Sequence, residues 1–229
     1  MRDKGPDAVL WDMDGTLVDS EKLWTVALHD TARLLGGTMS AAARAAVVGG
    51  DMARTLATLF DDLGLPRDPA RMAEAERFID ERTAELFAGG LSWRPGAQEA
   101  LRLLDGLGWP TALVTNTGRT LAEAALDSIG REHFTVSVCA DEVPFGKPDP
   151  DPYLRAAELL GMAPARCLAI EDSPNGALAA QRSGAAVLVV PCDVPVPGGP
   201  GRVLRTSLAG LTRDDLHASY AEARGERVA

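Results

Sequence analysis

Short apolar runs recur along the chain, and each is followed by a segment with helical periodicity. The runs are rich in Val, Leu and Ile without polar alternation and lie at residues 8–11, 111–114, 135–138, 167–170 and 186–190. Strands of this composition are typical of a parallel sheet covered on both faces. Helical patterns lie at residues 94–107, 119–129, 150–160 and 174–183. The alternation predicts an α/β fold, an open parallel sheet with helices on both faces and right-handed connections.

The interval between residues 17 and 91 interrupts this alternation, because it shows helical patterns and no convincing strand. The expected helices lie at residues 21–35, 41–48, 52–63 and 71–87. The last of them carries one apolar stripe at helical spacing, formed by Met72, Ala75, Ile79 and Leu86. We therefore expect residues 17–91 to form a helical domain inserted into a core of residues 1–16 and 92–229. Segments 17–20 and 89–94 would connect the two domains.

The C-terminal part has the weakest pattern. Residues 191–201 are rich in Pro and Gly and indicate a loop, and residues 212–224 suggest a final surface helix. The sequence assigns no role to this tail.

The composition is that of an ordinary globular protein, with 46% hydrophobic and 24% charged residues. The formal net charge is −10, from 33 acidic and 23 basic residues, and no basic cluster reverses it locally. Such a surface repels nucleic acid, whereas a few cations and backbone donors suffice to hold one phosphate. We expect a small phosphorylated metabolite as the partner, no nucleic acid, and no obligate protein partner.

Two further features indicate the compartment. The longest aliphatic run, residues 185–190, is too short to span a bilayer, and the N-terminus shows no signal-peptide pattern. Cys139, Cys167 and Cys192 are odd in number and lack CxxC spacing, which argues against a disulfide framework or a zinc site. The prediction is a soluble cytoplasmic protein without a membrane partner.

Two carboxylates follow the first expected strand directly, at its carboxyl end, where open α/β sheets place their sites. Asp12 and Asp14 repel each other unless a cation lies between them, and an oxygen-rich cluster of this kind suits Mg²⁺. Gly15 allows the chain to turn so that backbone groups approach a bound anion. An Asp-Gly pair after a strand is often a plain turn, but the string at residues 12–16 after an apolar strand favours a functional site.

Further polar segments follow later strands in the same way. Thr115 and Asn116 end the second strand, where they either serve the site or cap the next helix. Lys147 stands in a Gly-Lys-Pro string ahead of a helix, which is a more constrained place than that of a solvated surface lysine. Glu171 and Asp172 follow the fourth strand. We expect these segments to form the walls of one site with Asp12.

Together these segments resemble the motifs of the haloacid dehalogenase-like superfamily. The string DMDGT at residues 12–16 is similar to its first motif, DxDG[TV]. Residues 115–116, 146–151 and 171–173 match the second, third and fourth motifs in order. The resemblance implies a Rossmann-like α/β core and a phosphatase that uses Mg²⁺ as its cofactor.

The resemblance also implies catalytic roles for four residues. Asp12 attacks phosphorus and forms an aspartyl-phosphate, which splits one difficult displacement into two easier ones. Asp14 protonates the leaving group and then deprotonates the hydrolytic water. Thr115 donates a hydrogen bond to the transferring phosphoryl group, and Lys147 offsets its negative charge.

A second set of residues is expected to bind the metal and the substrate. Mg²⁺ would be held by Asp12, by the backbone carbonyl of Asp14 and by Asp172, with Glu171 acting through water or from behind the ligands. The residues expected to contact phosphate or substrate are Gly15, Thr16, Asn116, Glu21, Gly49, Gly50 and Arg54.

The all-helical insert resembles the type 1 cap of this superfamily, which closes over the site and supplies substrate contacts. In its candidate specificity loop, residues 48–55, Gly49 and Gly50 suit the close approach of a ligand. Arg54 either faces a distal group of the substrate or is a solvated side chain in an ordinary helix–helix turn. Glu21 and Trp24 begin the first cap helix and are expected to line the substrate chamber, although Trp24 suits the cap core equally well.

Departures from individual subclasses narrow the prediction. Asp14 argues against a dehalogenase, which lacks this carboxylate, and Lys22 is poorly placed for the Schiff base of a phosphonatase. Trp24 stands where β-phosphoglucomutases carry a histidine. The pattern is closest to 2-deoxyglucose-6-phosphatase-like and β-phosphoglucomutase-like proteins. We predict a phosphomonoester hydrolase for a sugar or polyol phosphate, with a phosphomutase as the alternative and a non-catalytic phosphometabolite-binding protein as a further one.

Overall fold

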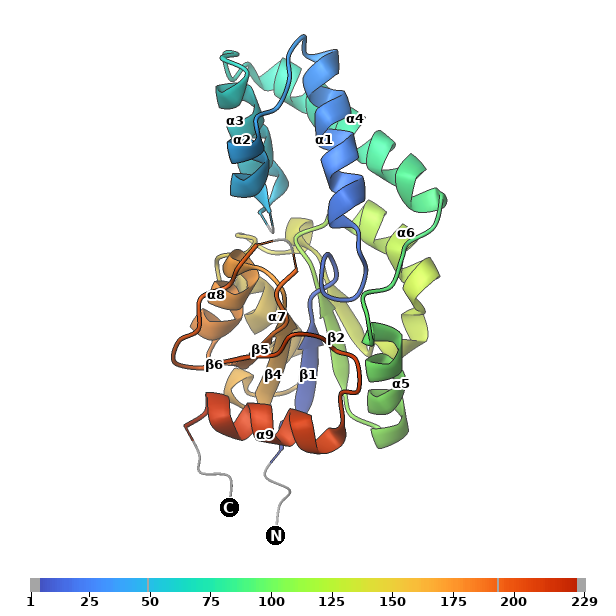
Figure 1. Cartoon of the computed structure of the whole chain (residues 1–229), viewed down its shortest axis with the longest axis vertical. Helices are drawn as coiled ribbons and strands as arrows, with labels where there is room; N and C mark the ends of the chain where they lie inside the picture. Colours follow the sequence, from blue (N-terminus) through green and yellow to red (C-terminus); the bar gives the residue numbers. More distant parts are fainter. Residues whose placement is uncertain (1–4, 49, 193, 226–229) are drawn as a thin grey trace.

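The structure, a computed structural model, describes residues 5–48, 50–192 and 194–225. Its centre is a six-stranded parallel sheet with the strand order β3-β2-β1-β4-β5-β6. The strands are β1 (Ala8–Trp11), β2 (Thr111–Val114), β3 (Val136–Val138), β4 (Cys167–Glu171), β5 (Ala186–Val189) and β6 (Arg202–Leu204). Because β1 lies between β2 and β4, the loop after β1 emerges in the middle of the carboxyl end of the sheet (Figure 1).

Helices cover both faces of the sheet, because alternate strand residues point to opposite faces and both sets are apolar. Val9 and Trp11 belong to one core with residues of α5, α6 and α9, whereas Ala8 and Leu10 belong to a second core with residues of α7 and α8. These helices are α5 (Ala97–Leu107), α6 (Arg119–Ile129), α7 (Asp151–Leu159), α8 (Pro174–Ser183) and α9 (Arg213–Ala223). The predicted three-layer α/β fold is thus confirmed.

Four more helices form a group above the carboxyl end of the sheet, here called the helical unit (Figure 1). They are α1 (Glu21–Leu34), α2 (Ala41–Val47), α3 (Met52–Asp62) and α4 (Pro69–Ala88). The unit has its own apolar core, which includes Leu28, Leu59, Phe60 and Ile79. Three of its helices begin at side-chain caps, in which Ser40, Asp51 and Asp68 each accept a hydrogen bond from a backbone amide.

The two segments that join the helical unit to the sheet pair with each other. The amide of Asp19 donates to the carbonyl of Ser92, and the amide of Arg94 donates to the carbonyl of Leu17. An antiparallel bridge joins Val18 to Trp93 between these bonds. The helical unit is therefore attached through one short two-stranded connection at its lower end.

Most elements lie within three residues of the positions that the sequence pattern predicted. The main exception is β6, which the pattern missed because Arg202–Leu204 is short and none of its residues is fully buried. Helix α5 begins later than predicted, at Ala97, because Gly96 before it adopts φ 83°. Helix α4 begins earlier, at Pro69, where Asp68 caps it.

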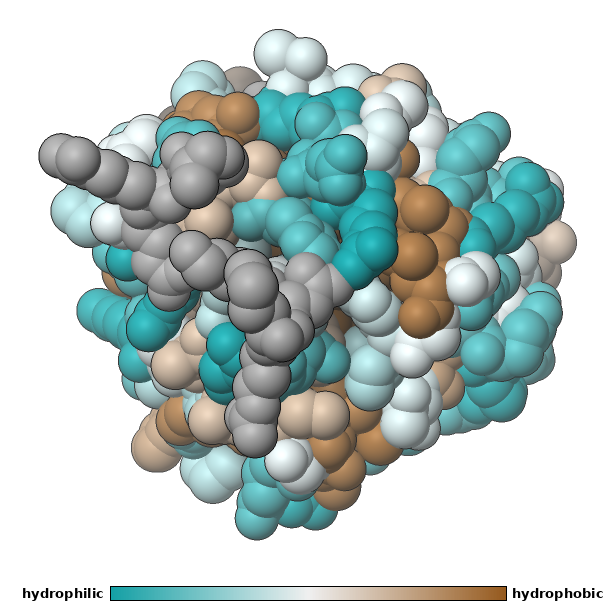
Figure 2. All heavy atoms as spheres, turned by 90° about the horizontal axis from the view of Figure 1, so that it is seen from below, coloured by the Kyte–Doolittle hydropathy of each residue, from teal (hydrophilic) through white to brown (hydrophobic). Residues whose placement is uncertain are grey.

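The opposite end of the molecule carries the amino ends of the strands and α9. Figure 2 shows this face as a mixture of hydrophilic groups with small separate hydrophobic ones. In the part of the chain that the structure describes, no helix combines the length and the apolar character needed to cross a bilayer.

Replacement of Gly96 should destabilise the fold more than replacement of another left-handed glycine. An added Cβ at Gly96 would collide with the backbone of Leu208 and Ala209, whereas one at Gly108 would meet nothing within 4 Å. Both residues have positive φ, which costs an L-residue about 1–2 kcal/mol. We expect Gly96→Ala to lower the free energy of unfolding in urea by about 1–3 kcal/mol more than Gly108→Ala. Equal losses would show that the 208–209 segment does not pack against this turn.

Candidate active site

Asp12 stands at the end of β1 with one satisfied and one unsatisfied carboxylate oxygen. Its side chain is buried, and Oδ1 accepts a hydrogen bond of 2.6 Å from Nζ of Lys147. Oδ2 is also buried but has no hydrogen-bond partner among the described residues. Because a buried polar atom without a partner is costly, Oδ2 marks a place that suits a ligand atom.

The loop after Asp12 passes very close to Asp172, and Gly15 makes this possible. Gly15 has φ 87°, and an added Cβ would overlap Oδ2 of Asp172. The contact with Asp172 therefore explains why a glycine stands at this turn, while its approach to a bound anion stays a prediction. Thr16 is buried beside it, and its hydroxyl has no partner among the described residues.

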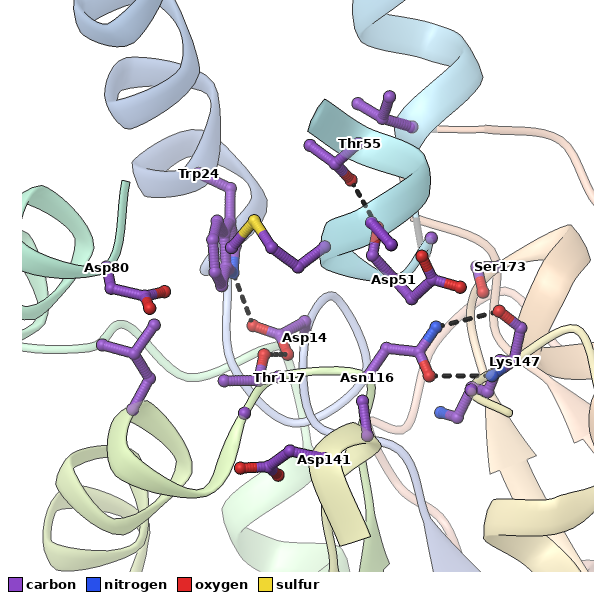
Figure 3. Close-up of a pocket in the computed structure, with 18 of the residues that line it drawn as sticks. Asp14, Trp24, Asp51, Thr55, Asp80, Asn116, Thr117, Asp141, Lys147 and Ser173 are labelled. Carbon is purple, nitrogen blue, oxygen red and sulfur yellow. Dashed lines mark hydrogen bonds between the residues drawn. The ribbon is translucent and has the colours of Figure 1, made fainter. Parts of the chain in front are cut away.

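The carboxylate of Asp14 accepts hydrogen bonds from four side chains. Oδ1 accepts from Oγ of Ser20 at 2.6 Å and from Nε1 of Trp24 at 3.0 Å. Oδ2 accepts from the hydroxyls of Thr117 at 2.7 Å and Thr115 at 3.1 Å. Figure 3 shows Trp24 and Thr117 reaching Asp14 from the helical unit and from the sheet, respectively. Asp14 thereby joins the helical unit to the strand ends.

Thr115 and Thr117 differ in how they reach the site. Thr115 is completely buried, and its hydroxyl accepts a hydrogen bond from the amide of Thr117. Thr115 contacts Asp14 but does not line the cavity, whereas Thr117 does both. The sequence pattern singled out Thr115 and missed Thr117, although a second hydroxyl two residues further along the same loop was the available signal.

Lys147 is buried between two carboxylates. Its Nζ donates to Oδ1 of Asp12 and Oε1 of Glu171, both at 2.6 Å, and to the carbonyl of Val114 at 2.9 Å. Burial by itself lowers the pKa of this amine, but the charges of Asp12 and Glu171 outweigh it and raise the pKa above its usual value. Lys147 therefore stays protonated.

Asn116 holds the backbone of Lys147 in place. Its side-chain oxygen accepts from the amide of Lys147 at 2.8 Å, and its side-chain nitrogen donates to the carbonyl of Lys147 at 3.0 Å (Figure 3). The sequence pattern placed Asn116 at the phosphate. In the structure it lines the cavity and also fixes the loop that carries the lysine.

Three buried carboxylates could hold a metal ion: side-chain oxygens of Asp12, Glu171 and Asp172 all lie within 4.8 Å of one another. Glu171 is already occupied, because Oε1 accepts from Lys147 and Tyr153, and Oε2 accepts from the amide of Asp172. This leaves Asp12 and Asp172 with free oxygens, which agrees with the expected position of Glu171 behind the ligands. The side chain of Asp14 is outside this group, and the expected contact there is its backbone carbonyl.

The charge balance of this cluster favours a hard divalent cation. Burial and then the charge of Glu171 raise the pKa of Asp12 to about 8. Burial and then Asp12 raise the pKa of Asp172 well above its usual value. One ammonium group does not offset three carboxylates, and an all-oxygen set of ligands suits Mg²⁺. The residues present therefore fit the expected metal.

A cavity of about 530 Å³ lies between the strand ends and the helical unit. Its lining includes Asp12, Asp14 and Lys147 below and residues of all four helices of the helical unit above. This volume suits a ligand of the size of a sugar phosphate.

The predicted contacts from the helical unit are only partly found at this cavity. Gly50 and Glu21 line it, while Gly49 lies outside the described residues. Arg54 is exposed and does not line it, because the start of α3 presents its neighbours instead. The arginine of the helical unit that does line it is Arg44, whose guanidinium bonds the carboxylate of Glu21 and the hydroxyl of Thr25. Arg44 lies in an alanine-rich helix without any motif, so no feature of the sequence singled it out.

The comparison with known proteins agrees with the chemistry that these site residues indicate. A family model for haloacid dehalogenase-like hydrolases matches residues 6–184. Hexitol phosphatase B of Escherichia coli (strain K12) is 32% identical over 221 residues, which cover 91% of this chain and 96% of that protein.

Solved structures show the same fold. CbbY of Rhodobacter sphaeroides, solved with phosphate and as a mutant with xylulose-(1,5)bisphosphate, has a TM-score of 0.81 and 29% identity, covering 92% of this chain and 99% of that one. β-Phosphoglucomutase of Clostridium difficile has a TM-score of 0.84 at 16% identity, covering 96% of this chain and 100% of that one. At 16% identity, the similarity to β-phosphoglucomutase shows a shared fold only.

Loss of the indole hydrogen bond to Asp14 should weaken the link between the helical unit and the sheet. Trp24→Phe keeps an aromatic ring but removes the donor, and we expect it to lower the free energy of unfolding in urea by about 1 kcal/mol more than Trp93→Phe. Trp93 is a matched control because it is also partly buried against the core and makes no side-chain hydrogen bond with a described residue. Identical losses would mean that the bond to Asp14 contributes nothing.

Proposed function

The chain belongs to the haloacid dehalogenase-like hydrolase family, and we propose that it is a Mg²⁺-dependent phosphomonoester hydrolase that acts through an aspartyl-phosphate. The observation that carries the proposal is the buried, unpartnered Oδ2 of Asp12, a residue that lines the same cavity as Lys147 and Asp14. The proposed substrate is a small sugar or polyol phosphate. The hexitol phosphatase among the relatives and the size of the cavity support this class.

In the first step a carboxylate oxygen of Asp12 attacks phosphorus, and the bond between phosphorus and the leaving oxygen breaks. Asp14 gives its proton to that oxygen, which departs as an alcohol. Lys147 offsets the charge on Asp12 through a contact that exists before the reaction, and from the same position it offsets the charge on the transferring phosphoryl group. Such preorganisation costs no rearrangement at the moment of transfer.

In the second step a water molecule attacks phosphorus of the aspartyl-phosphate. Asp14, now ionised, takes a proton from the water, and Asp12 is regenerated as phosphate leaves. The partners of Asp14 suit both states, because the hydroxyls of Ser20, Thr115 and Thr117 either donate or accept a hydrogen bond after a simple rotation.

We propose that Asp12, Asp172 and the backbone carbonyl of Asp14 hold the cation. Bound Mg²⁺ would screen the repulsion between the phosphate and the carboxylates and orient the ester for attack. Glu171 serves the site indirectly, because it binds Lys147 and the amide of Asp172.

Residues 17–91 are proposed to act as a cap on a core of residues 1–16 and 92–229. The separate apolar core of the helical unit and its short paired connection support this division. Closure of such a cap excludes water and brings its substrate contacts to the reacting group. Glu21 and Gly50 line the cavity and are the proposed contacts on this side.

A cytoplasmic location is proposed from the cysteines. Cys139 and Cys167 are free thiols, and both are buried. Burial raises the pKa of the thiols of Cys139 to about 12 and of Cys167 to about 11, which makes them inert fillers of the core. Unpaired thiols of this kind fit a reducing compartment.

Removal of the nucleophile should abolish activity. We expect Asp12→Asn to reduce phosphate release from p-nitrophenyl phosphate by at least about a thousandfold, because the amide cannot form the aspartyl-phosphate. The control is Asp127→Asn, an exposed aspartate paired with Arg131 on the surface. Turnover by the Asp12 variant at the rate of the control would rule out this nucleophile.

Removal of the cation should also silence the enzyme. EDTA is expected to stop phosphate release and excess Mg²⁺ to restore it, since one lysine does not balance the buried carboxylates. Mg²⁺ should also raise the melting temperature of the wild-type protein, because a ligand that binds the folded state stabilises it. Asp172→Asn should lose most of that rise. Full activity in EDTA, or an equal rise in the variant, would contradict the proposed metal site.

A further inference from the structure

The cavity above the catalytic residues is lined by many more carboxylates than cations. Among its described lining residues nine are acidic, namely Asp12, Asp14, Glu21, Asp51, Glu76, Asp80, Asp141, Asp149 and Asp172, and three are basic, namely Arg44, Arg119 and Lys147. Each of the basic side chains already contacts at least one carboxylate: Glu21 for Arg44, Glu142 for Arg119, and Asp12 with Glu171 for Lys147. The wall that the helical unit contributes carries Glu21, Asp51, Glu76 and Asp80 against Arg44 and is therefore negative.

Asp80 is a carboxylate of this wall that has no protein partner among the described residues. It lies on α4, is half-buried, and makes no hydrogen bond or ion pair with any described residue. Figure 3 shows its carboxylate directed towards the middle of the pocket, on the side of Trp24 and Asp14. Burial, and then the charges of Glu76 and Asp141, raise the pKa of Asp80 to about 6, so it is mostly ionised at neutral pH.

An ionised carboxylate in this position accepts hydrogen bonds and donates none. Glu76, which lines the same side of the cavity, likewise has no donor among the described residues. A ligand that binds these carboxylates must bring hydrogen-bond donors, such as the hydroxyl groups of a polyol. A second phosphate or a carboxylate on the ligand brings acceptors and negative charge, and both are repelled there.

The ligand must also reach the catalytic end of the same cavity. There the buried and unpartnered Oδ2 of Asp12 provides an independent sign of where the phosphoryl group binds. A substrate that occupies both ends therefore carries one phosphate at the end near Lys147 and a neutral, hydroxyl-bearing portion at the end near Asp80.

Resting on the proposed phosphatase function, we propose that Asp80 is a specificity-determining residue. It accepts hydrogen bonds from hydroxyl groups of the leaving group and, with Glu76 and Asp141, excludes substrates that carry a second anionic group. The enzyme then selects monophosphates of neutral polyols or sugars against the corresponding bisphosphates.

The test compares kcat/KM for a hexitol 6-phosphate and the matching hexitol 1,6-bisphosphate in the presence of Mg²⁺. We expect the wild-type enzyme to favour the monophosphate by about tenfold or more, and Asp80→Asn to reduce that preference by about tenfold, the size of one lost like-charge repulsion. The reduction should combine a lower kcat/KM for the monophosphate with a higher one for the bisphosphate. The ratio of two activities in one preparation does not depend on how much of the variant is folded.

Glu81→Gln is the matched control, because Glu81 is the exposed neighbour of Asp80 on α4, does not line the cavity and carries the same charge. It should keep the wild-type ratio within about twofold, since a distant charge in water is screened. An unchanged ratio in Asp80→Asn, or equal shifts in both variants, would overturn the role of Asp80. Equal wild-type activity on both substrates would overturn the exclusion of a second anion. No phosphate release from either hexitol phosphate or from p-nitrophenyl phosphate would instead overturn the proposed function, and this inference with it.

Discussion

The ammonium group of Lys147 is the interaction on which the arrangement of the site depends. It contacts Asp12 and Glu171 at 2.6 Å each, and all three groups are buried. Without this cation the two carboxylates would be uncompensated charges in the protein interior, which is strongly destabilising. Because Asp12 follows β1, Glu171 ends β4 and Val114, a third acceptor of this ammonium group, ends β2, its contacts join three strand ends.

The carboxylates of the cavity are arranged differently in its two halves, the one near the sheet and the one near α4. Near the sheet, Asp12 and Asp172 lie close enough to share a cation. Burial first, and then repulsion from neighbouring carboxylates, raise the pKa of both groups, and such a cation would relieve that repulsion. Near α4 the carboxylates are spread along the wall, and the grouping that could bind a metal does not include Asp80 or Glu76. Acceptors that are neither paired nor chelated are suited to the hydroxyl groups of a ligand. Carboxylates thus serve both the proposed reaction and the proposed selection of the substrate, because those near the sheet are clustered and those near α4 are spread apart.

Asp14 joins these two halves. Ser20 and Trp24, in the connection and in α1, bind one of its oxygens, while Thr115 and Thr117 at the end of β2 bind the other. The ring of Trp24 also packs edge-on against Phe87 of α4, with the centroids 6.3 Å apart. The residue proposed to move protons in both steps is therefore held by the sheet and by the helical unit together. A change in the position of the helical unit would reach Asp14 through Trp24.

The sequence by itself determined the sheet and the residues at its carboxyl end. Apolar runs without alternation specify strands covered on both faces, and carboxyl ends of parallel strands meet, so Asp12, Lys147 and Asp172 were predicted to meet and do. Only the tertiary structure placed Arg44 rather than Arg54 at the cavity and set Asp80 in the wall of the cavity that the nucleophile also lines. These positions depend on how the helices of the helical unit pack over the sheet. Such packing brings together residues far apart in the chain, and periodicity along the chain reports only which face of each helix is buried.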